Sequence, residues 1–138
     1  MKIAVVGLGY VGLPLALLFA RAGAEVVGLD IDPSKTDALT AGRSYIRHIP
    51  AETIRAQVTA GRLRATTDFS AVQQVEAVII CVPTPLTPNR EPDISYILNT
   101  GRTLAPFLQR GTLVVLESTT YPGTTDPICG PSWKPAPA

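Results

Sequence analysis

Three glycines follow the first apolar run of the chain, and their spacing constrains its fold more than any other feature. Residues 3–6 are Ile, Ala, Val and Val, a short run that predicts a buried strand. Gly7, Gly9 and Gly12 come next in a Gly-x-Gly-x-x-Gly pattern, and residues 13–22 predict a helix. A glycine-rich turn alone is common, so the strand before it and the helix after it carry the interpretation. The pattern predicts a strand–turn–helix unit that binds an anion at the helix N-terminus.

Each glycine has its own expected role in such a turn, and an acid further along completes the pattern. Gly7 permits the tight turn, Gly9 lets the backbone approach a pyrophosphate, and Gly12 lets the helix pack against the strand. Asp30 follows a second predicted strand, residues 25–29, and lies 18 residues after Gly12. A carboxylate there accepts hydrogen bonds from both adenosine ribose hydroxyls and repels a 2′-phosphate. The sequence therefore predicts a dinucleotide site that favours NAD over NADP.

Two neighbours of Asp30 are also candidates for this site. Asp32 is the competing acid, but it directly precedes Pro33, so we expect it to cap the next helix instead. Lys35 either reaches the same ribose or lies on a solvated helix face, and the sequence leaves both alternatives open.

Predicted helices and strands alternate along the rest of the chain. We expect helices over residues 33–40, 51–60 and 94–108, strands over 63–66, 75–82 and 112–116, and a proline-rich loop over 83–92. Strands that are apolar on both faces and alternate with helices predict a parallel sheet covered on both sides. The predicted fold class is α/β, a Rossmann-type doubly wound parallel sheet truncated after its fifth main strand.

Composition excludes several classes of function. The net charge is +1, so no basic surface suggests nucleic acid or a membrane as a partner. Two cysteines and one histidine are too few for a disulfide framework or a Cys/His zinc site. No apolar run approaches the roughly 18 residues of a membrane span, and Gly7, Gly9 and Gly12 interrupt the run that a signal peptide needs. We expect a cytoplasmic protein that uses no metal.

Four blocks of sequence occur in a distinctive order within residues 1–125. They are GLGYVGLPLA at 7–16, SYIRHIP at 44–50, ICVPTPL at 80–86 with EPD at 91–93, and ESTTYPGT at 117–124. Together they resemble the UDP-glucose/GDP-mannose dehydrogenase family. The residues Tyr121-Pro122-Gly123 and the block at 44–46 favour the branch of UDP-N-acetylglucosamine and UDP-N-acetylmannosamine 6-dehydrogenases over the UDP-glucose branch.

The resemblance implies a reaction and a set of cofactor contacts. The family oxidises the C6 hydroxyl of a nucleotide sugar, here a UDP-N-acetylhexosamine, to a carboxylate with two NAD, through a cysteine-bound intermediate. The nucleophilic cysteine belongs to the second half of a longer chain, so we expect this chain alone to be inactive and the full-length enzyme to be a homodimer. Thr119 is implied to lie near the nicotinamide and to hold the reactive water. The residues expected to contact NAD are Gly7, Gly9, Tyr10, Val11, Gly12, Asp30, Lys35, Cys81, Val82, Pro83, Thr84, Ser118 and Thr119.

Several alternatives remain beside this interpretation. The chain could be a standalone, non-catalytic NAD-binding module, the front domain of a UDP-glucose 6-dehydrogenase, or part of a 3-hydroxyacid dehydrogenase; the blocks at 44–50 and 80–86 weigh against the last. Cys81 is expected to be a buried small apolar residue rather than a nucleophile. His48 is expected to be a loop residue rather than a base, and Arg90 faces either substrate or solvent.

The last 13 residues differ from the rest of the chain. Residues 126–138 contain four prolines and an isolated Trp133, without periodicity. The resemblance implies a helix here, which four prolines forbid. Codons that each start one base earlier permit Leu-Arg-Pro-Ile-Leu-Glu-Ala-Gly-Thr-Gly, in which only the Glu is forced. We therefore expect an NAD-binding domain over residues 1–125 followed by a frameshifted, non-native tail, which the DNA sequence can test.

Overall fold

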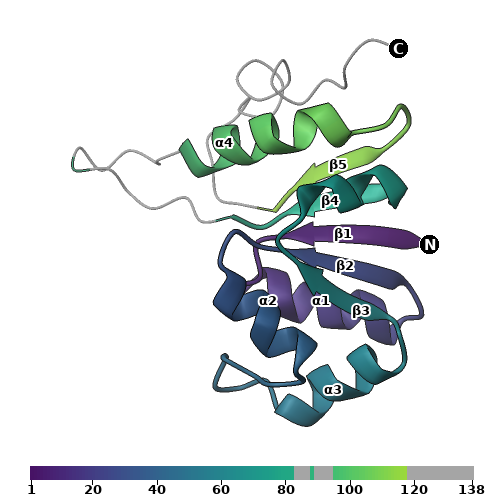
Figure 1. Cartoon of the computed structure of the whole chain (residues 1–138), viewed down its shortest axis with the longest axis vertical. Helices are drawn as coiled ribbons and strands as arrows, with labels where there is room; N and C mark the ends of the chain where they lie inside the picture. Colours follow the sequence, from purple (N-terminus) through teal and green to yellow (C-terminus); the bar gives the residue numbers. More distant parts are fainter. Residues whose placement is uncertain (83–87, 89–94, 118–138) are drawn as a thin grey trace.

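A five-stranded parallel sheet forms the centre of the protein in the computed structural model, which describes residues 1–82, 88 and 95–117 (Figure 1). The strands are β1 Lys2–Val6, β2 Glu25–Leu29, β3 Leu63–Thr66, β4 Ala77–Ile80 and β5 Leu113–Leu116, in the order β3-β2-β1-β4-β5. All four neighbouring pairs are parallel. The chain runs outward from β1 to β3 and then returns to place β4 on the other side of β1. The predicted doubly wound α/β fold is confirmed.

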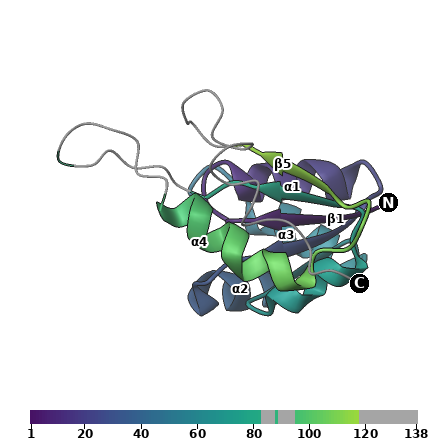
Figure 2. The same cartoon turned by 90° about the horizontal axis from the view of Figure 1, so that it is seen from above.

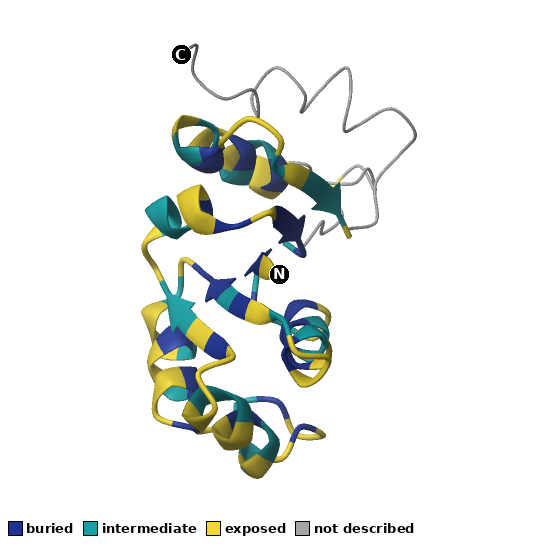
Figure 3. Ribbon diagram, turned by 90° about the vertical axis from the view of Figure 1, so that its right-hand side faces the viewer, coloured by how far each residue is buried: buried dark blue, intermediate teal, exposed yellow. Residues whose placement is uncertain are grey.

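Helices cover both faces of this sheet. The helices are α1 Gly12–Arg21, α2 Pro33–Thr40, α3 Ala51–Thr59 and α4 Ser95–Leu104. Alternate residues of β1 enter different cores: Ile3 and Val5 pack with α1, α2 and α3, whereas Ala4 and Val6 pack with α4 on the opposite face (Figure 2). Buried strand residues therefore lie between partly exposed helices (Figure 3). Two-sided burial explains why the strands are apolar at nearly every position.

Local side-chain chemistry sets the ends of α2. The Ser34 backbone N–H donates to Asp32 Oδ1 at 2.9 Å, so Asp32 caps the helix, as predicted. After the helix, Gly42 adopts a φ of 74°, and the Arg43 N–H donates to the Ala38 carbonyl at 2.8 Å. A left-handed glycine followed by this backward hydrogen bond is a common helix terminator.

The structure differs from the sequence prediction in three places. The expected helix over 94–108 ends as an α-helix at Leu104 and continues as a 3₁₀ turn, Ala105–Phe107, because Pro106 has no N–H to donate. A second 3₁₀ helix, Phe69–Gln74, was not predicted; it is too short to show an apolar period. Strand β4 is shorter than residues 75–82, since Val75 follows this 3₁₀ helix directly. The expected loop over 83–92 lies outside the described residues apart from residue 88.

Within the described ranges, none of the helices is long and apolar enough to cross a membrane.

The exposed edge of β5 leads to a prediction about association. Among the described residues β5 pairs only with β4, and Leu113 is 60% exposed. An apolar edge strand with free backbone groups is a template for pairing with other chains. We expect light scattering to show association that rises with concentration, and Leu113→Lys to reduce it. Leu18→Lys is the matched control, because Leu18 is 59% exposed but lies on α1. A stable wild-type monomer at high concentration would contradict the prediction.

Candidate functional site

A cavity of about 720 Å³ opens at the carboxyl ends of the strands, where the strand order reverses between β1 and β4. Open α/β sheets bind ligands at this position, and the volume falls within the range of about 300–1,000 Å³ that is typical of ligand sites. Eight of the residues predicted to contact the cofactor line the cavity. They are Gly7, Gly9, Tyr10, Val11, Asp30, Lys35, Cys81 and Val82.

Two glycines of the turn are required by the fold itself. Gly7 has a φ of 92°, and a Cβ there would lie 2.6 Å from the Cys81 carbonyl oxygen. A Cβ on Gly12 would lie 1.6 Å from the Gly7 carbonyl oxygen, an impossible overlap. Gly9 differs, because no heavy atom lies within 4 Å of its Cβ position. Gly7 and Gly12 thus let the strand, turn and helix approach one another, and Gly9 leaves open space beside the cavity.

The backbone N–H groups of the turn divide into two sets. The Gly7 N–H donates to the Leu29 carbonyl at 2.7 Å, and the Leu8 N–H donates to Asp30 Oδ2 at 2.8 Å. The N–H groups of Gly9, Tyr10 and Val11 have no acceptor within the part of the chain that the structure describes. They precede α1, whose N-terminus carries a partial positive charge. The turn therefore offers unpaired donors to an anion.

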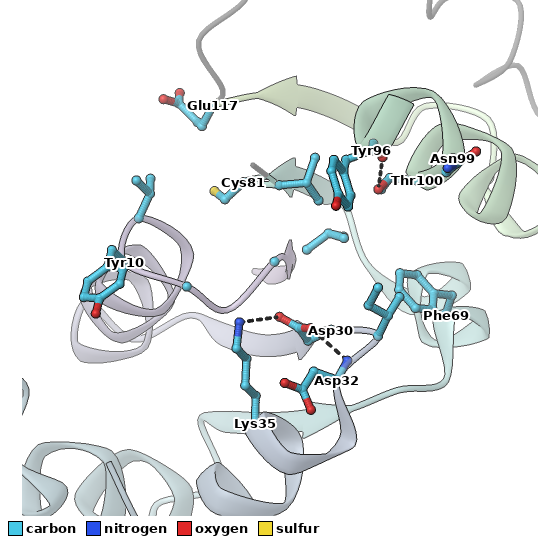
Figure 4. Close-up of a pocket in the computed structure, with 16 residues that line it drawn as sticks. Tyr10, Asp30, Asp32, Lys35, Phe69, Cys81, Tyr96, Asn99, Thr100 and Glu117 are labelled. Atoms are coloured by element: carbon cyan, nitrogen blue, oxygen red, sulfur yellow. Dashed lines mark hydrogen bonds and ion pairs between the residues drawn. The ribbon is translucent and has the colours of Figure 1, made fainter. Parts of the chain in front are cut away.

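Asp30 links this turn to the end of β2. Its side chain is largely buried and accepts hydrogen bonds from the N–H of Leu8 at Oδ2 and, at 2.9 Å, from the N–H of Asp32 at Oδ1. Lys35 Nζ lies 4.0 Å from Asp30 Oδ2, so this side chain lies beside the carboxylate (Figure 4). A carboxylate has about four lone-pair positions. Asp30 can therefore accept two further hydrogen bonds from a ligand while it holds the turn.

Cys81 and Glu117 lie at the other end of the cavity, after β4 and β5 (Figure 4). The Cys81 N–H donates to the Val6 carbonyl at 2.7 Å, and its side chain is buried, as expected. Burial raises the pKa of this thiol to about 11, and the negative charge of Glu117 contributes to the increase. Because the thiolate is the nucleophilic form, Cys81 is unreactive at neutral pH.

Apart from Asp32, the competing acid, seven cavity residues were not candidates for contacting a ligand. They are Val6, Ile31, Phe69, Tyr96, Asn99, Thr100 and Glu117. Phe69 belongs to the 3₁₀ helix Phe69–Gln74, which is too short to show an apolar period, so no sequence pattern pointed to it. Tyr96, Asn99 and Thr100 are spaced as i, i+3 and i+4 on α4. This spacing places the three side chains on one face of the helix and could have been recognised in the sequence.

The other residues considered as candidates from the sequence do not line the cavity or lie outside the described residues. Gly12 supports the turn without lining the cavity. The His48 ring stacks on that of Tyr10, with centroids 6.5 Å apart and planes 20° apart. Residues 1–82, 88 and 95–117 contain no group of three His, Cys, Asp or Glu side chains arranged to hold a metal. The candidates that lie outside the described residues are Pro83, Thr84, Arg90, Ser118 and Thr119.

Three features together define a dinucleotide-binding Rossmann domain: a helix N-terminus, an acid at the end of β2, and a glycine turn whose N–H groups at residues 9–11 are unpaired among the described residues. The chain belongs to the UDP-glucose/GDP-mannose dehydrogenase family, because the NAD-binding domain of that family matches residues 1–136. The resemblance found in the four sequence blocks is thereby confirmed.

Named relatives and solved structures agree with this assignment. The chain is 45% identical over 127 residues to NDP-N-acetyl-D-galactosaminuronic acid dehydrogenase of Ralstonia nicotianae, covering 91% of this chain and 29% of that protein. It is 39% identical over 127 residues to UDP-N-acetyl-D-mannosamine dehydrogenase of Pyrococcus horikoshii, covering 91% and 30%. A ternary complex of GDP-mannose dehydrogenase from Pseudomonas aeruginosa matches with a TM-score of 0.90 and 34% identity, covering 96% and 32%. The chain thus spans about a third or less of these proteins.

Proposed function

We propose that this chain is the NAD-binding part of a nucleotide-sugar 6-dehydrogenase that oxidises the C6 hydroxyl of a UDP-N-acetylhexosamine to a carboxylate with two NAD. The observation that carries the proposal is the set of unpaired N–H groups of Gly9, Tyr10 and Val11 beside the buried carboxylate of Asp30 in one cavity. The N-acetylhexosamine branch is supported by relatives named for N-acetyl-D-galactosaminuronic acid and N-acetyl-D-mannosamine.

The described residues suit the adenosine ribose and the pyrophosphate of NAD. The N–H groups of residues 9–11 suit the pyrophosphate, and the free lone pairs of Asp30 suit the adenosine ribose hydroxyls. Ile31, which is 79% exposed at this end of the cavity, offers apolar surface to the base. Cys81 and Val82 then line the end toward β4. NAD, when bound, supplies the hydride acceptor for the oxidation of the sugar carbon.

The proposal extends to features that the described residues do not reach. Pro83, Thr84, Ser118 and Thr119 complete the cofactor site, and Thr119 holds the reactive water. The full-length enzyme acts as a homodimer in the cytoplasm. The NAD-binding domain covers residues 1–125, and residues 126–138 are a frameshifted tail.

One measurement tests the cofactor assignment, and a second tests the reaction and its substrate. Titration of the purified chain with NADH, followed by fluorescence or calorimetry, is expected to show saturable binding that ADP-ribose displaces; no binding by a folded sample would contradict the cofactor assignment. The protein read from the continuous open frame of the gene is expected to form two NADH per UDP-N-acetylhexosamine. A clear preference of that protein for UDP-glucose would contradict the substrate branch.

We predict that the 138-residue chain alone forms no NADH from a UDP-N-acetylhexosamine. The reaction requires an activated nucleophile near the reacting carbon. The cysteine that could act as a nucleophile in the described part of the chain is Cys81. Its raised pKa of about 11 keeps the thiol protonated at neutral pH. The measurement is NADH absorbance over time, with NADH binding by the same sample as the control for folding. Substrate-dependent NADH formation would refute the prediction.

A further inference from the structure

Leu8, between the first two glycines of the turn, is held from three sides. Its N–H donates to Asp30 Oδ2 at 2.8 Å, and its carbonyl oxygen accepts a hydrogen bond from the Tyr45 hydroxyl. Its side chain is fully buried against Gly28 of β2, where a Cβ would lie only 2.9 Å from Leu8 Cδ2. The Asp30 and Gly28 contacts come from the neighbouring strand and its end. The Tyr45 contact comes from a separate segment, between α2 and α3.

The segment that carries Tyr45 is itself well anchored. Ile46 and Ile49 are buried in the core on the α1 side of the sheet. Ser44 Oγ donates to the Ile46 carbonyl at 2.9 Å, and the Ile49 N–H donates to the same carbonyl at 3.1 Å. The Tyr45 ring is half-buried and packs against this core. The hydroxyl is therefore presented to Leu8 from a fixed position.

The bond to the Leu8 oxygen has a consequence for the next residue. The Leu8 C=O and the Gly9 N–H belong to one planar peptide unit, and no cis peptide occurs among the described residues. In a trans unit these two groups point in opposite directions, so a bond that fixes the oxygen also fixes the N–H. Without a side chain, Gly9 has more rotational freedom than any other residue. Its N–H is the first of the three unpaired donors of the turn.

We propose that Tyr45 is a positioning residue for dinucleotide binding, which acts by fixing the Leu8–Gly9 peptide so that the Gly9 N–H faces the pyrophosphate. This inference rests on the proposed NAD function. It assigns a cofactor-related role to the block at residues 44–50, which supplies no cavity-lining residue. Tyr45 itself does not line the cavity.

The protonation state of Tyr45 suits this role. Burial raises its pKa above the ordinary value, and the negative charges of Asp30 and Asp32 raise it further. Both carboxylates are negatively charged and therefore disfavour the negatively charged phenolate form of Tyr45. The hydroxyl therefore remains a donor throughout the neutral and mildly alkaline range.

The test compares two ligands that differ in the pyrophosphate. Tyr45→Phe removes the hydroxyl, and the expected result is ADP-ribose binding weakened about fivefold, as for the loss of one neutral hydrogen bond, with adenosine binding unchanged. Ser44→Ala is the matched control, because it loosens the same segment without touching Leu8. We expect it to leave the ratio of the two affinities unchanged. Equal weakening of both ligands by Tyr45→Phe, or no weakening, would overturn the proposal.

A second measurement separates this inference from the proposed function. In the ligand-free protein, Tyr45→Phe is expected to shift the backbone ¹⁵N resonance of Gly9 more than that of Gly23, which lies far from the turn. If wild-type protein binds neither NADH nor ADP-ribose, the NAD function fails, whereas an unshifted Gly9 resonance overturns the role of Tyr45 alone. If Tyr45→Phe does not fold, the Tyr45 hydroxyl proton of the wild-type protein decides: it is expected to exchange slowly with solvent, and fast exchange overturns the proposal.

Discussion

Gly12→Ala is expected to destabilise the protein by roughly 3 kcal/mol, at the upper end of what overpacking costs, whereas Gly9→Ala is expected to leave its stability almost unchanged. The Cβ on residue 12 would overlap the Gly7 carbonyl oxygen at 1.6 Å. The oxygen is a backbone atom and the Cβ is bonded directly to the Cα, so no side-chain rotation relieves the overlap. The Cβ on residue 9 would meet no heavy atom within 4 Å. Alanine is also the better helix former at position 12, so the observed loss would understate the steric cost.

The two variants are expected to separate folding from binding. Gly9→Ala adds a methyl group where we expect the backbone to approach the pyrophosphate, so NADH affinity should fall about tenfold, equivalent to about 1.4 kcal/mol. Urea denaturation measures the stability of both variants, and NADH titration at a temperature where both are folded measures affinity. Equal stability losses in the two variants would contradict the different roles assigned to the two glycines.

Wild-type protein is expected to bind NADH far more tightly than NADPH, and Asp30→Ala is expected to abolish most of that difference. The substitution removes charge-assisted hydrogen bonds to the ribose, which should weaken NADH binding by about 1–3 kcal/mol. It also removes the repulsion that the carboxylate exerts on a 2′-phosphate. Calorimetric titration with both cofactors measures the change in the ratio.

Asp30→Ala has a structural effect that must be separated from selectivity. The carboxylate accepts the N–H groups of Leu8 and Asp32, so its loss also loosens the turn and lowers stability. Asp37→Ala is the matched control, since it removes the same charge from an exposed position of α2 that does not line the cavity. The control should leave the NADH to NADPH ratio unchanged. Equal affinities of the wild-type protein for the two cofactors would overturn the role of Asp30.

The sequence alone predicted the glycine turn and the acid beside it, because the patterns that indicate them lie close together in the chain. The alternation of apolar strands and helices, the glycine spacing and the Asp32 cap depend on residues that are near neighbours in the chain. Asp30 could be identified because a βαβ unit places the residue after its second strand beside the glycine turn. The same reasoning failed at Pro106 and at Phe69–Gln74, where a short element shows no periodicity.

Only the tertiary structure decided which distant residues complete the site. The parallel sheet brings the Cys81 carbonyl against Gly7, and it places α4 and the end of β5 around the same cavity. Packing of Ile46 and Ile49 in the core delivers the Tyr45 hydroxyl to Leu8, across 37 positions of sequence. These contacts depend on strand order and core packing. Both bring together segments that are distant in the sequence, and no short-range sequence pattern predicts that they meet. The sequence by itself therefore specified a dinucleotide turn and its acid, and the fold supplied the surroundings that hold the turn in shape.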